Sequence, residues 1–68
     1  MAERTYLNSS FLEAFEYDDE KMELTIYFKN GKEYTYSDVP PEVVEDFKNS
    51  DSCGRYYSAN IKGKYSEG

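Results

Sequence analysis

The most constraining feature of the sequence is a stretch, residues 22–36, whose pattern predicts one β-hairpin. Apolar and polar side chains alternate on the way in, as in a strand with one buried side. Asn30-Gly31 then supplies a turn, because both residue types tolerate a positive φ. The return strand carries Tyr34 and Tyr36 two residues apart, so they share a face. The alternating apolar positions are Met22, Leu24, Ile26 and Phe28.

Two registers are compatible with this turn. A two-residue loop would pair Lys29 with Lys32. It would place Tyr34 and Tyr36 on the face of the sheet away from the apolar residues of the first strand. A three-residue loop, 29–31, collects nearly all the large apolar groups on one face. Because a one-residue slip moves every side chain to the other face, burial favours this second register, with Gly31 in the left-handed region as a bulge. The expected pairs are Phe28 with Lys32, Ile26 with Tyr34, and Leu24 with Tyr36.

The residues before the hairpin predict one further strand. In 9–17, Phe11, Phe15 and Tyr17 have strand spacing, and Leu12 and Ala14 fit the opposite face. A short polar connection, 18–21, links this strand to the hairpin and favours an antiparallel meander. Residues 1–8 are polar and are interpreted as a flexible lead-in, and 66–68 as a frayed tail.

After the hairpin the pattern becomes helical. Pro41 suits a first helical turn, and Val43, Val44 and Phe47 form an apolar stripe that should lie on the sheet. Ser52 is typical of an N-cap for a second short helix, from Cys53 to about Ile61. We therefore predict an α+β fold in one domain, 9–65: a three-stranded antiparallel β-meander packed on one face by two short C-terminal helices, in the order β-β-β-α-α.

Composition excludes several classes of function. The chain has no histidine and a single cysteine, Cys53, so neither a zinc site nor catalysis by a Ser-His or Cys-His pair is expected. We therefore expect a non-enzymatic protein without metal or cofactor. The sequence contains no run of about 18 apolar residues, so no membrane span is predicted. The N-terminus lacks the apolar core of a signal peptide. A single cysteine fits a reducing compartment, so the expected location is cytoplasmic.

Charge is unevenly distributed around a net value of −6. Residues 13–23 hold six acids against Lys21 alone, whereas 52–65 hold Arg55, Lys62 and Lys64 and no acid. The overall charge argues against tight non-specific binding to a phosphate backbone. The asymmetry indicates either two surfaces with different partners or ordinary surface variation.

The C-terminal segment contains the candidate ligand-binding residues. At the predicted helix start, Ser52, Gly54 and Arg55 could hold an anion, since free N–H groups, a hydroxyl and a guanidinium meet there. The alternative is that Ser52 only caps the helix and Gly54 only permits close packing. The following residues interleave aromatic rings with cations, as single-stranded RNA binders do, although buried rings and solvated lysines would give the same pattern. The candidates in this second stretch are Tyr56, Asn60, Lys62 and Lys64.

The acidic residues Asp18, Asp19 and Glu20 are the candidate partner-binding residues. A cation site would need further oxygen ligands at fixed spacing, and the sequence lacks them. A solvated turn is the plainer interpretation, and a surface that meets a basic protein is the functional one.

Taken together, these motifs resemble the KTSC domain, a family named for its place at the C-terminus of some lysyl-tRNA synthetases. The similarity covers roughly residues 9–65. Its pattern comprises Ser10, Tyr17-Asp18, Leu24-x-Ile26-x-Phe28-x-Asn30-Gly31, Tyr34-x-Tyr36, Val39-Pro40 and Ser52-x-Gly54-x-Tyr56-Tyr57-x-x-x-Ile61. The resemblance implies a small domain that also occurs as stand-alone bacterial or phage proteins. For this family, RNA binding has been suggested from its company with a tRNA-charging enzyme.

The resemblance and the charge pattern lead to two hypotheses. The first is a binding module for RNA or a nucleotide that uses the basic, tyrosine-rich C-terminal face. This chain is more acidic than the usual family member, which weakens the transfer of RNA binding from the family to this chain. The second is a small acidic interaction or inhibitor module whose 13–23 surface meets a basic host protein. A purely structural or oligomerising module is a third class that the sequence leaves open.

Overall fold

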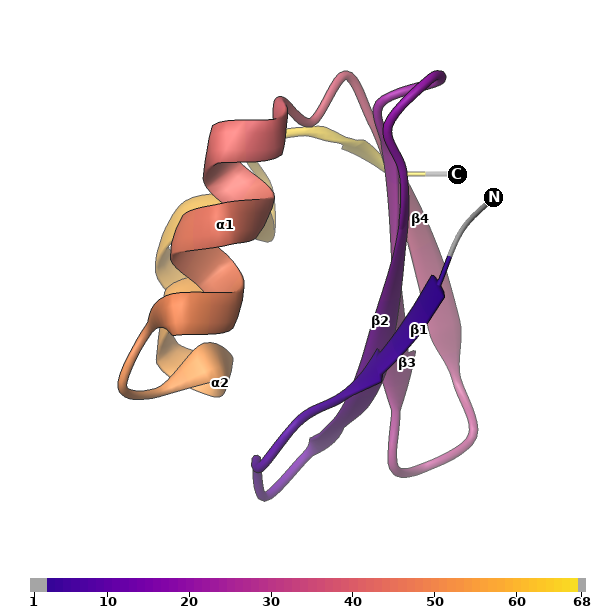
Figure 1. The fold of residues 1–68 in the computed structure, drawn as a ribbon. Helices are drawn as coiled ribbons and strands as arrows, with labels where there is room; N and C mark the ends of the chain where they lie inside the picture. Colours follow the sequence, from indigo (N-terminus) through magenta and orange to yellow (C-terminus); the bar gives the residue numbers. More distant parts are fainter. Residues whose placement is uncertain (1–2, 68) are drawn as a thin grey trace.

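The structure, a computed structural model, describes residues 3–67 of the chain. In this part an antiparallel sheet of five strands, in the order β1-β2-β3-β4-β5, is covered on one face by the helices (Figure 1). The strands are β1 (Glu3–Tyr6), β2 (Leu12–Asp18), β3 (Glu23–Phe28), β4 (Glu33–Ser37) and β5 (Ser66–Glu67). The helices are α1 (Pro41–Asn49), α2 (Cys53–Tyr56) and the π-helix η1 (Tyr57–Ile61). The α+β class and the two-layer arrangement are as predicted.

The predicted number of three strands is wrong. Strand β1 forms within the segment interpreted as a lead-in and pairs with β2, from Glu3 opposite Tyr17 to Tyr6 opposite Ala14. The two-residue strand β5 forms within the predicted tail and pairs with the end of β4. Both are short edge strands. Their backbone hydrogen bonds do not require alternating apolar and polar residues, so the sequence pattern did not reveal them. The predicted lead-in and tail also include residues 1–2 and 68, which lie outside the described residues.

The predicted hairpin register is confirmed. Leu24 pairs with Tyr36 and Ile26 with Tyr34, and the Phe28 N–H donates to the Lys32 carbonyl at 2.8 Å. Gly31 has φ +92°, the left-handed conformation that a three-residue loop requires. Tyr36 is fully buried and Tyr34 half-buried, as expected when burial decides which face the strand presents.

Strand β2 contains a bulge that changes the predicted side of one residue. The register with β3 shifts between Leu12 and Ala14, so Leu12 pairs with Phe28 on the core face, the same face as Phe15 opposite Ile26. The prediction that the side chains of Leu12 and Phe15 lie on opposite faces of the sheet is therefore wrong. An extra residue on one strand lets two apolar side chains three apart reach the same layer.

The helices follow the predicted pattern with one local difference. In α1, Val44 and Phe47 are buried and Val43 is half-buried, so the apolar stripe faces the sheet. Ser52 caps the next helix, which ends at Ile61 as predicted, but its second half is a π-helix in which the Lys62 N–H donates to the Tyr57 carbonyl at 2.8 Å. A π turn holds more residues than an α turn, so residues four apart lie closer to the same side. Tyr57 and Ile61, which lie four residues apart, are both buried.

The core lies between the sheet and the helices. Its buried members are Leu12, Phe15, Leu24, Ile26, Tyr36, Val39, Val44, Phe47, Tyr57 and Ile61. The hydroxyls of Tyr36 and Tyr57 form a hydrogen bond of 2.5 Å inside it, which satisfies polar groups that burial would otherwise penalise.

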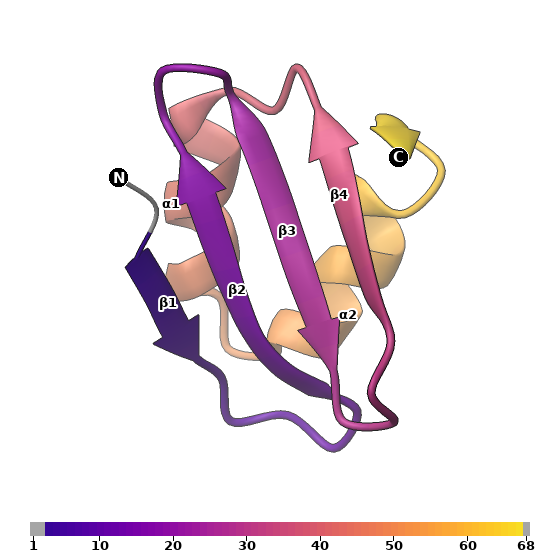
Figure 2. The ribbon, with the colours of Figure 1, turned by 90° about the vertical axis from the view of Figure 1, so that its right-hand side faces the viewer.

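The strand directions give the sheet two ends of different composition (Figure 2). Asp18, the last residue of β2, lies at one end, together with the connection from β2 to β3, which carries Asp19 and Glu20. The turn from β3 to β4, which contains Lys29 and Asn30, lies at the other, together with the β1–β2 connection and α2. The acidic candidates and the hairpin turn are therefore separated by the length of the strands.

Candidate nucleic-acid interface

Ser52, at the start of α2, forms its hydrogen bonds within the protein. The Ser52 hydroxyl accepts a hydrogen bond from the Arg55 N–H at 3.3 Å, and the Ser52 carbonyl accepts from the Tyr56 N–H at 3.0 Å. Gly54 is buried, and a Cβ there would lie 2.6 Å from ring carbon Cε1 of Phe11. A glycine at this position thus permits the close approach of an aromatic ring, and Arg55 extends into solvent as the exposed cation of this segment.

Four of the seven predicted ligand-binding residues line one hollow, which we call the helix groove. Its volume is about 340 Å³, and its lining residues are Ser50, Asp51, Ser52, Arg55, Tyr56, Ala59 and Asn60. The Tyr56 ring packs against Phe47 with centroids 6.1 Å apart, and burial, followed by the charge of Asp46, raises the pKa of its hydroxyl. The groove therefore combines a partly covered ring, an amide and a guanidinium, but Asp51 offsets the positive charge.

The structure does not bring the two lysines of the predicted site into the helix groove. Lys62 lines a separate hollow on the other side of the helix, with Ser58 and Tyr57. Lys64 lies in the turn that follows η1, where Gly63 has φ +77° and the Lys64 N–H donates to the Ile61 carbonyl. The predicted ligand-binding residues thus form a continuous segment of chain but occupy more than one surface.

The hollow beside Lys62 is lined mainly by aromatic side chains that were not predicted to form a site. It has a volume of about 330 Å³, and its lining residues are Phe11, Phe28, Tyr34, Tyr57, Ser58 and Lys62. A second hollow of about 410 Å³ adjoins it, shares Phe11 and Phe28, and adds Ser10, Lys29 and Asn30. We call the two together the aromatic cradle. The available signal was the alternation of rings and lysines on both sides of the hairpin turn.

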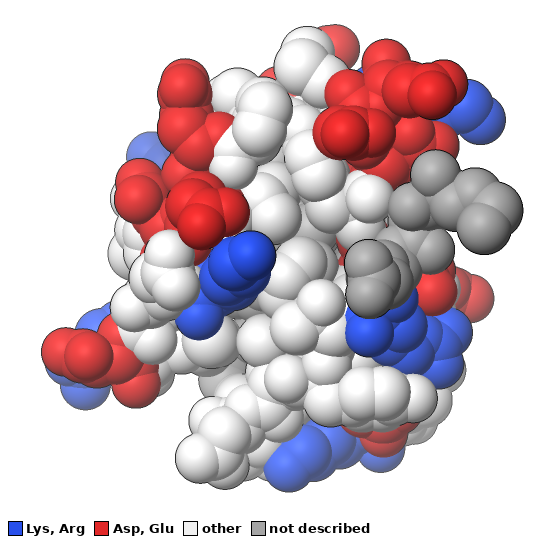
Figure 3. All heavy atoms as spheres, in the orientation of Figure 1, with Lys and Arg blue, Asp and Glu red and all other residues white. Residues whose placement is uncertain are grey.

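The acidic candidates form an ordered turn. Asp18 Oδ1 accepts hydrogen bonds from the N–H groups of Glu20 at 3.1 Å and Lys21 at 3.3 Å. Asp18 is half-buried, whereas Asp19 and Glu20 are exposed. Figure 3 shows one group of acidic atoms at the upper right, where Figure 1 places the connection from β2 to β3, and a second group at the upper left, over α1. Asp18 therefore shapes the turn, and the other two acids project from it.

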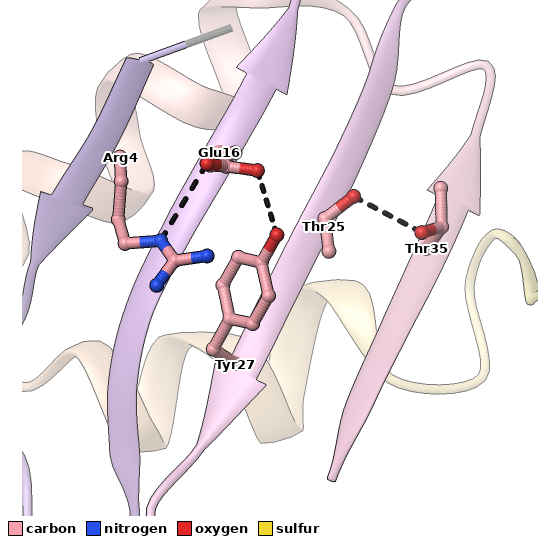
Figure 4. A network of polar contacts seen from close by, with 5 residues as sticks. All are labelled: Arg4, Glu16, Thr25, Tyr27 and Thr35. Carbon is pink, nitrogen blue, oxygen red and sulfur yellow. Dashed lines mark hydrogen bonds and ion pairs between the residues drawn. The ribbon is translucent and has the colours of Figure 1, made fainter. Parts of the chain in front are cut away.

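The sheet face that the helices leave open is polar, and several of its side chains bond to one another (Figure 4). Glu16 accepts a hydrogen bond from the Tyr27 hydroxyl at 2.6 Å and lies 3.5 Å from the Arg4 guanidinium. The same guanidinium lies 4.1 Å above the centroid of the Tyr27 ring. The bond to Glu16, then burial, raises the pKa of Tyr27. Thr25 and Thr35 join their hydroxyls at 3.0 Å across β3 and β4, so these polar groups satisfy one another.

Two further properties concern only the described part of the chain. Within residues 3–67, no three His, Cys, Asp or Glu side chains converge as metal ligands would. Neither α1 nor the helix that follows it has the length and apolar character needed to cross a bilayer.

Comparison with known proteins places this architecture in a family. Residues 8–65 match the KTSC domain over most of the chain. The chain belongs to the KTSC domain family. The crystal structure of a KTSC domain protein from Yersinia pestis superimposes with a TM-score of 0.95 at 29% sequence identity, covering 100% of this chain and 96% of that one.

Two sequence relatives differ in length. An uncharacterized protein of Stutzerimonas stutzeri is 39% identical over 62 residues, which cover 91% of this chain and 87% of that protein. A lysine–tRNA ligase of Nostoc punctiforme is 41% identical over 56 residues, which cover 82% of this chain but only 10% of the ligase. KTSC domains therefore occur both as most of a small protein and as a minor part of a large one.

Proposed function

We propose that this KTSC domain is a non-enzymatic module that binds single-stranded RNA through the aromatic and basic residues of its C-terminal helical segment. The observation that carries the proposal is the convergence of Arg55, Tyr56 and Asn60 in the helix groove, with Lys62 and Lys64 next along the chain. Ring faces accept stacked bases, and the cations neutralise phosphates.

The relatives supply the choice of RNA as the ligand. One of them is, by name, a lysine–tRNA ligase, in which a segment similar to this chain makes up 10% of the length. A small appended domain that holds RNA would suit such a protein.

The net charge sets an expectation for affinity. At −6 the chain as a whole repels nucleic acid, so binding depends on the few cations that touch phosphates. Each phosphate contact contributes to the salt dependence of the affinity. We expect weak, salt-sensitive binding with a small salt slope.

The test is a titration of labelled oligouridine into the protein at low and at physiological salt. Binding should weaken with salt and be lost when Arg55, Lys62 and Lys64 are all changed to alanine. The matched control changes Arg4, Lys21 and Lys48 to alanine, which removes the same charge elsewhere and should preserve most of the binding. Absence of binding by the unaltered protein at low salt would refute the proposal.

A second candidate function rests on the acidic turn. Because Asp18 fixes the turn through two backbone hydrogen bonds, the exposed carboxylates of Asp19 and Glu20 are presented in a defined position. Such a surface suits a basic protein partner. The variant with Asp19→Lys and Glu20→Lys keeps the turn and should lose a partner that the Arg55, Lys62 and Lys64 alanine variant retains. The opposite result would exclude the acidic turn as the interface.

A further inference from the structure

The aromatic cradle lies where three separate segments meet: the β1–β2 connection, the β3–β4 turn and the C-terminal helical segment. Phe28 is at its centre. Its ring meets Tyr34 edge-on at 5.5 Å and Tyr57 at 5.6 Å, and lies nearly parallel to Phe11 at 6.4 Å. Edge-on and offset-stacked contacts are the arrangements that aromatic pairs prefer, and they stabilise this cluster.

The fold also fixes the outermost ring of the cradle. Phe11 contacts Gly54, and its backbone is held on both sides, because its N–H donates to the Ser9 hydroxyl and its carbonyl accepts from the Lys29 N–H at 3.0 Å. Even so, Phe11 is 42% exposed, and Phe28 and Tyr34 are only half-buried. Preorganised rings with open surface lose little entropy when a flat ligand stacks on them.

Charge separates the cradle from the other hollows. Its described lining residues include Lys29 and Lys62 and no carboxylate. The helix groove is lined by both Arg55 and Asp51, and the hollow between the sheet and α1 by Lys48 together with Asp19 and Glu45. In a protein of net charge −6, an aromatic surface whose charged lining residues are both cations favours a ligand that is both aromatic and anionic.

We infer that the aromatic cradle is a nucleotide-binding subsite for single-stranded nucleic acid. A base stacks on the exposed ring of Phe11, beside the half-buried rings of Phe28 and Tyr34, and the flanking phosphates lie against Lys29 and Lys62. Asn30 and Ser58 supply polar groups at the rim that can meet a base edge or a sugar. The inference rests on the proposed function and adds to it a base-stacking site formed largely outside the C-terminal segment.

The experiment measures oligouridine affinity for two cradle variants, each with a matched control. Phe11→Leu keeps apolar bulk over Gly54 but removes the ring, and should weaken binding about tenfold, as expected for the loss of one stacked base. Tyr6→Leu, at a ring that is 69% exposed on the other face of the sheet, should have no effect. Lys29→Gln should weaken binding and reduce its salt dependence, whereas Lys48→Gln should do neither.

The outcomes separate this inference from the function on which it rests. Failure of the unaltered protein to bind would overturn both. Binding that is lost in the Arg55, Lys62 and Lys64 alanine variant but unchanged by Phe11→Leu and Lys29→Gln would overturn the cradle alone. Chemical shift changes of the cradle rings on titration would support it independently of any variant. Oligothymidine measured in parallel distinguishes RNA from DNA, since tighter binding of oligouridine indicates a contact with the 2′-hydroxyl.

Discussion

The acidic turn and the aromatic cradle occupy opposite ends of the same sheet and are stabilised by different forces. The acidic turn is held by hydrogen bonds from backbone N–H groups to Asp18, and its neighbouring carboxylates extend into water. The cradle is held by ring contacts around Phe28, and its cations lie beside apolar surface. A chain with a net charge of −6 can therefore still offer a cationic surface, because strand length separates it from most of the acids.

The largest expected effect tests whether the cradle is part of the packed structure. Phe28→Ala removes the ring that contacts Phe11, Tyr34 and Tyr57, and should lower the free energy of unfolding by about 3 kcal/mol. Urea denaturation followed by circular dichroism measures it. A loss well below that value would mean that the rings at this end contribute little to folding, unlike those of the core.

A smaller effect is expected at the acidic end. Asp18→Ala removes the acceptor for the N–H groups of Glu20 and Lys21, and should lower the free energy of unfolding by about 1 kcal/mol. The same denaturation experiment applies, with Asp19→Ala as the control, because Asp19 is exposed and should change stability little. Equal losses from the two variants would contradict the assignment of the turn to Asp18.

A pH effect sharpens the comparison further. Burial, followed by the charges of Asp19 and Asp18, raises the pKa of Tyr17, whose hydroxyl donates to the Val39 carbonyl at 2.6 Å. Because the folded-state pKa exceeds the ordinary value of about 10, the associated stability is complete below pH 10 and is lost as pH rises through the folded-state pKa. Tyr17→Phe should remove this part of the loss of stability at alkaline pH. Denaturation at a series of pH values would detect the change.

The smallest effect concerns the same hydroxyl. Asp19→Asn removes one nearby negative charge and should lower the pKa of Tyr17 slightly, while burial keeps it raised. An NMR titration of the Tyr17 ring measures the change. A pKa that returns fully to its ordinary value in this variant would show that charge, and not burial, is the main cause.

Much of the fold could be predicted from the sequence, because its signals are local. The three-residue loop followed from burial and from the tolerance of Gly31 for a positive φ, and the helix from Cys53 to Ile61 from the Ser52 cap. The edge strand β1 could not be predicted, since it depends on backbone pairing with a strand several residues away. The bulge in β2 was also missed, although two apolar residues three apart in a strand, Leu12 and Phe15, were a visible indication.

The candidate site was less accessible to prediction. The predicted ligand-binding residues are near one another in the chain, and the fold brings four of them into the helix groove. The aromatic cradle draws on segments around Phe11, Phe28 and Lys62, which only the folded sheet brings together. Gly54 illustrates the difference, because its close contact with Phe11 connects residues 43 positions apart.

The placement of the edge strands determines how this domain can be tethered. Strand β1 begins at Glu3 opposite Tyr17, near the acidic turn, and β5 pairs with Tyr36 and Ser37 at the same end of β4. Both ends of the described chain therefore leave from the half of the sheet that lies away from the hairpin turn (Figure 2). A linker or a second domain attached at either end would leave the aromatic cradle facing outward, so the domain can be grafted onto a larger body without covering that surface.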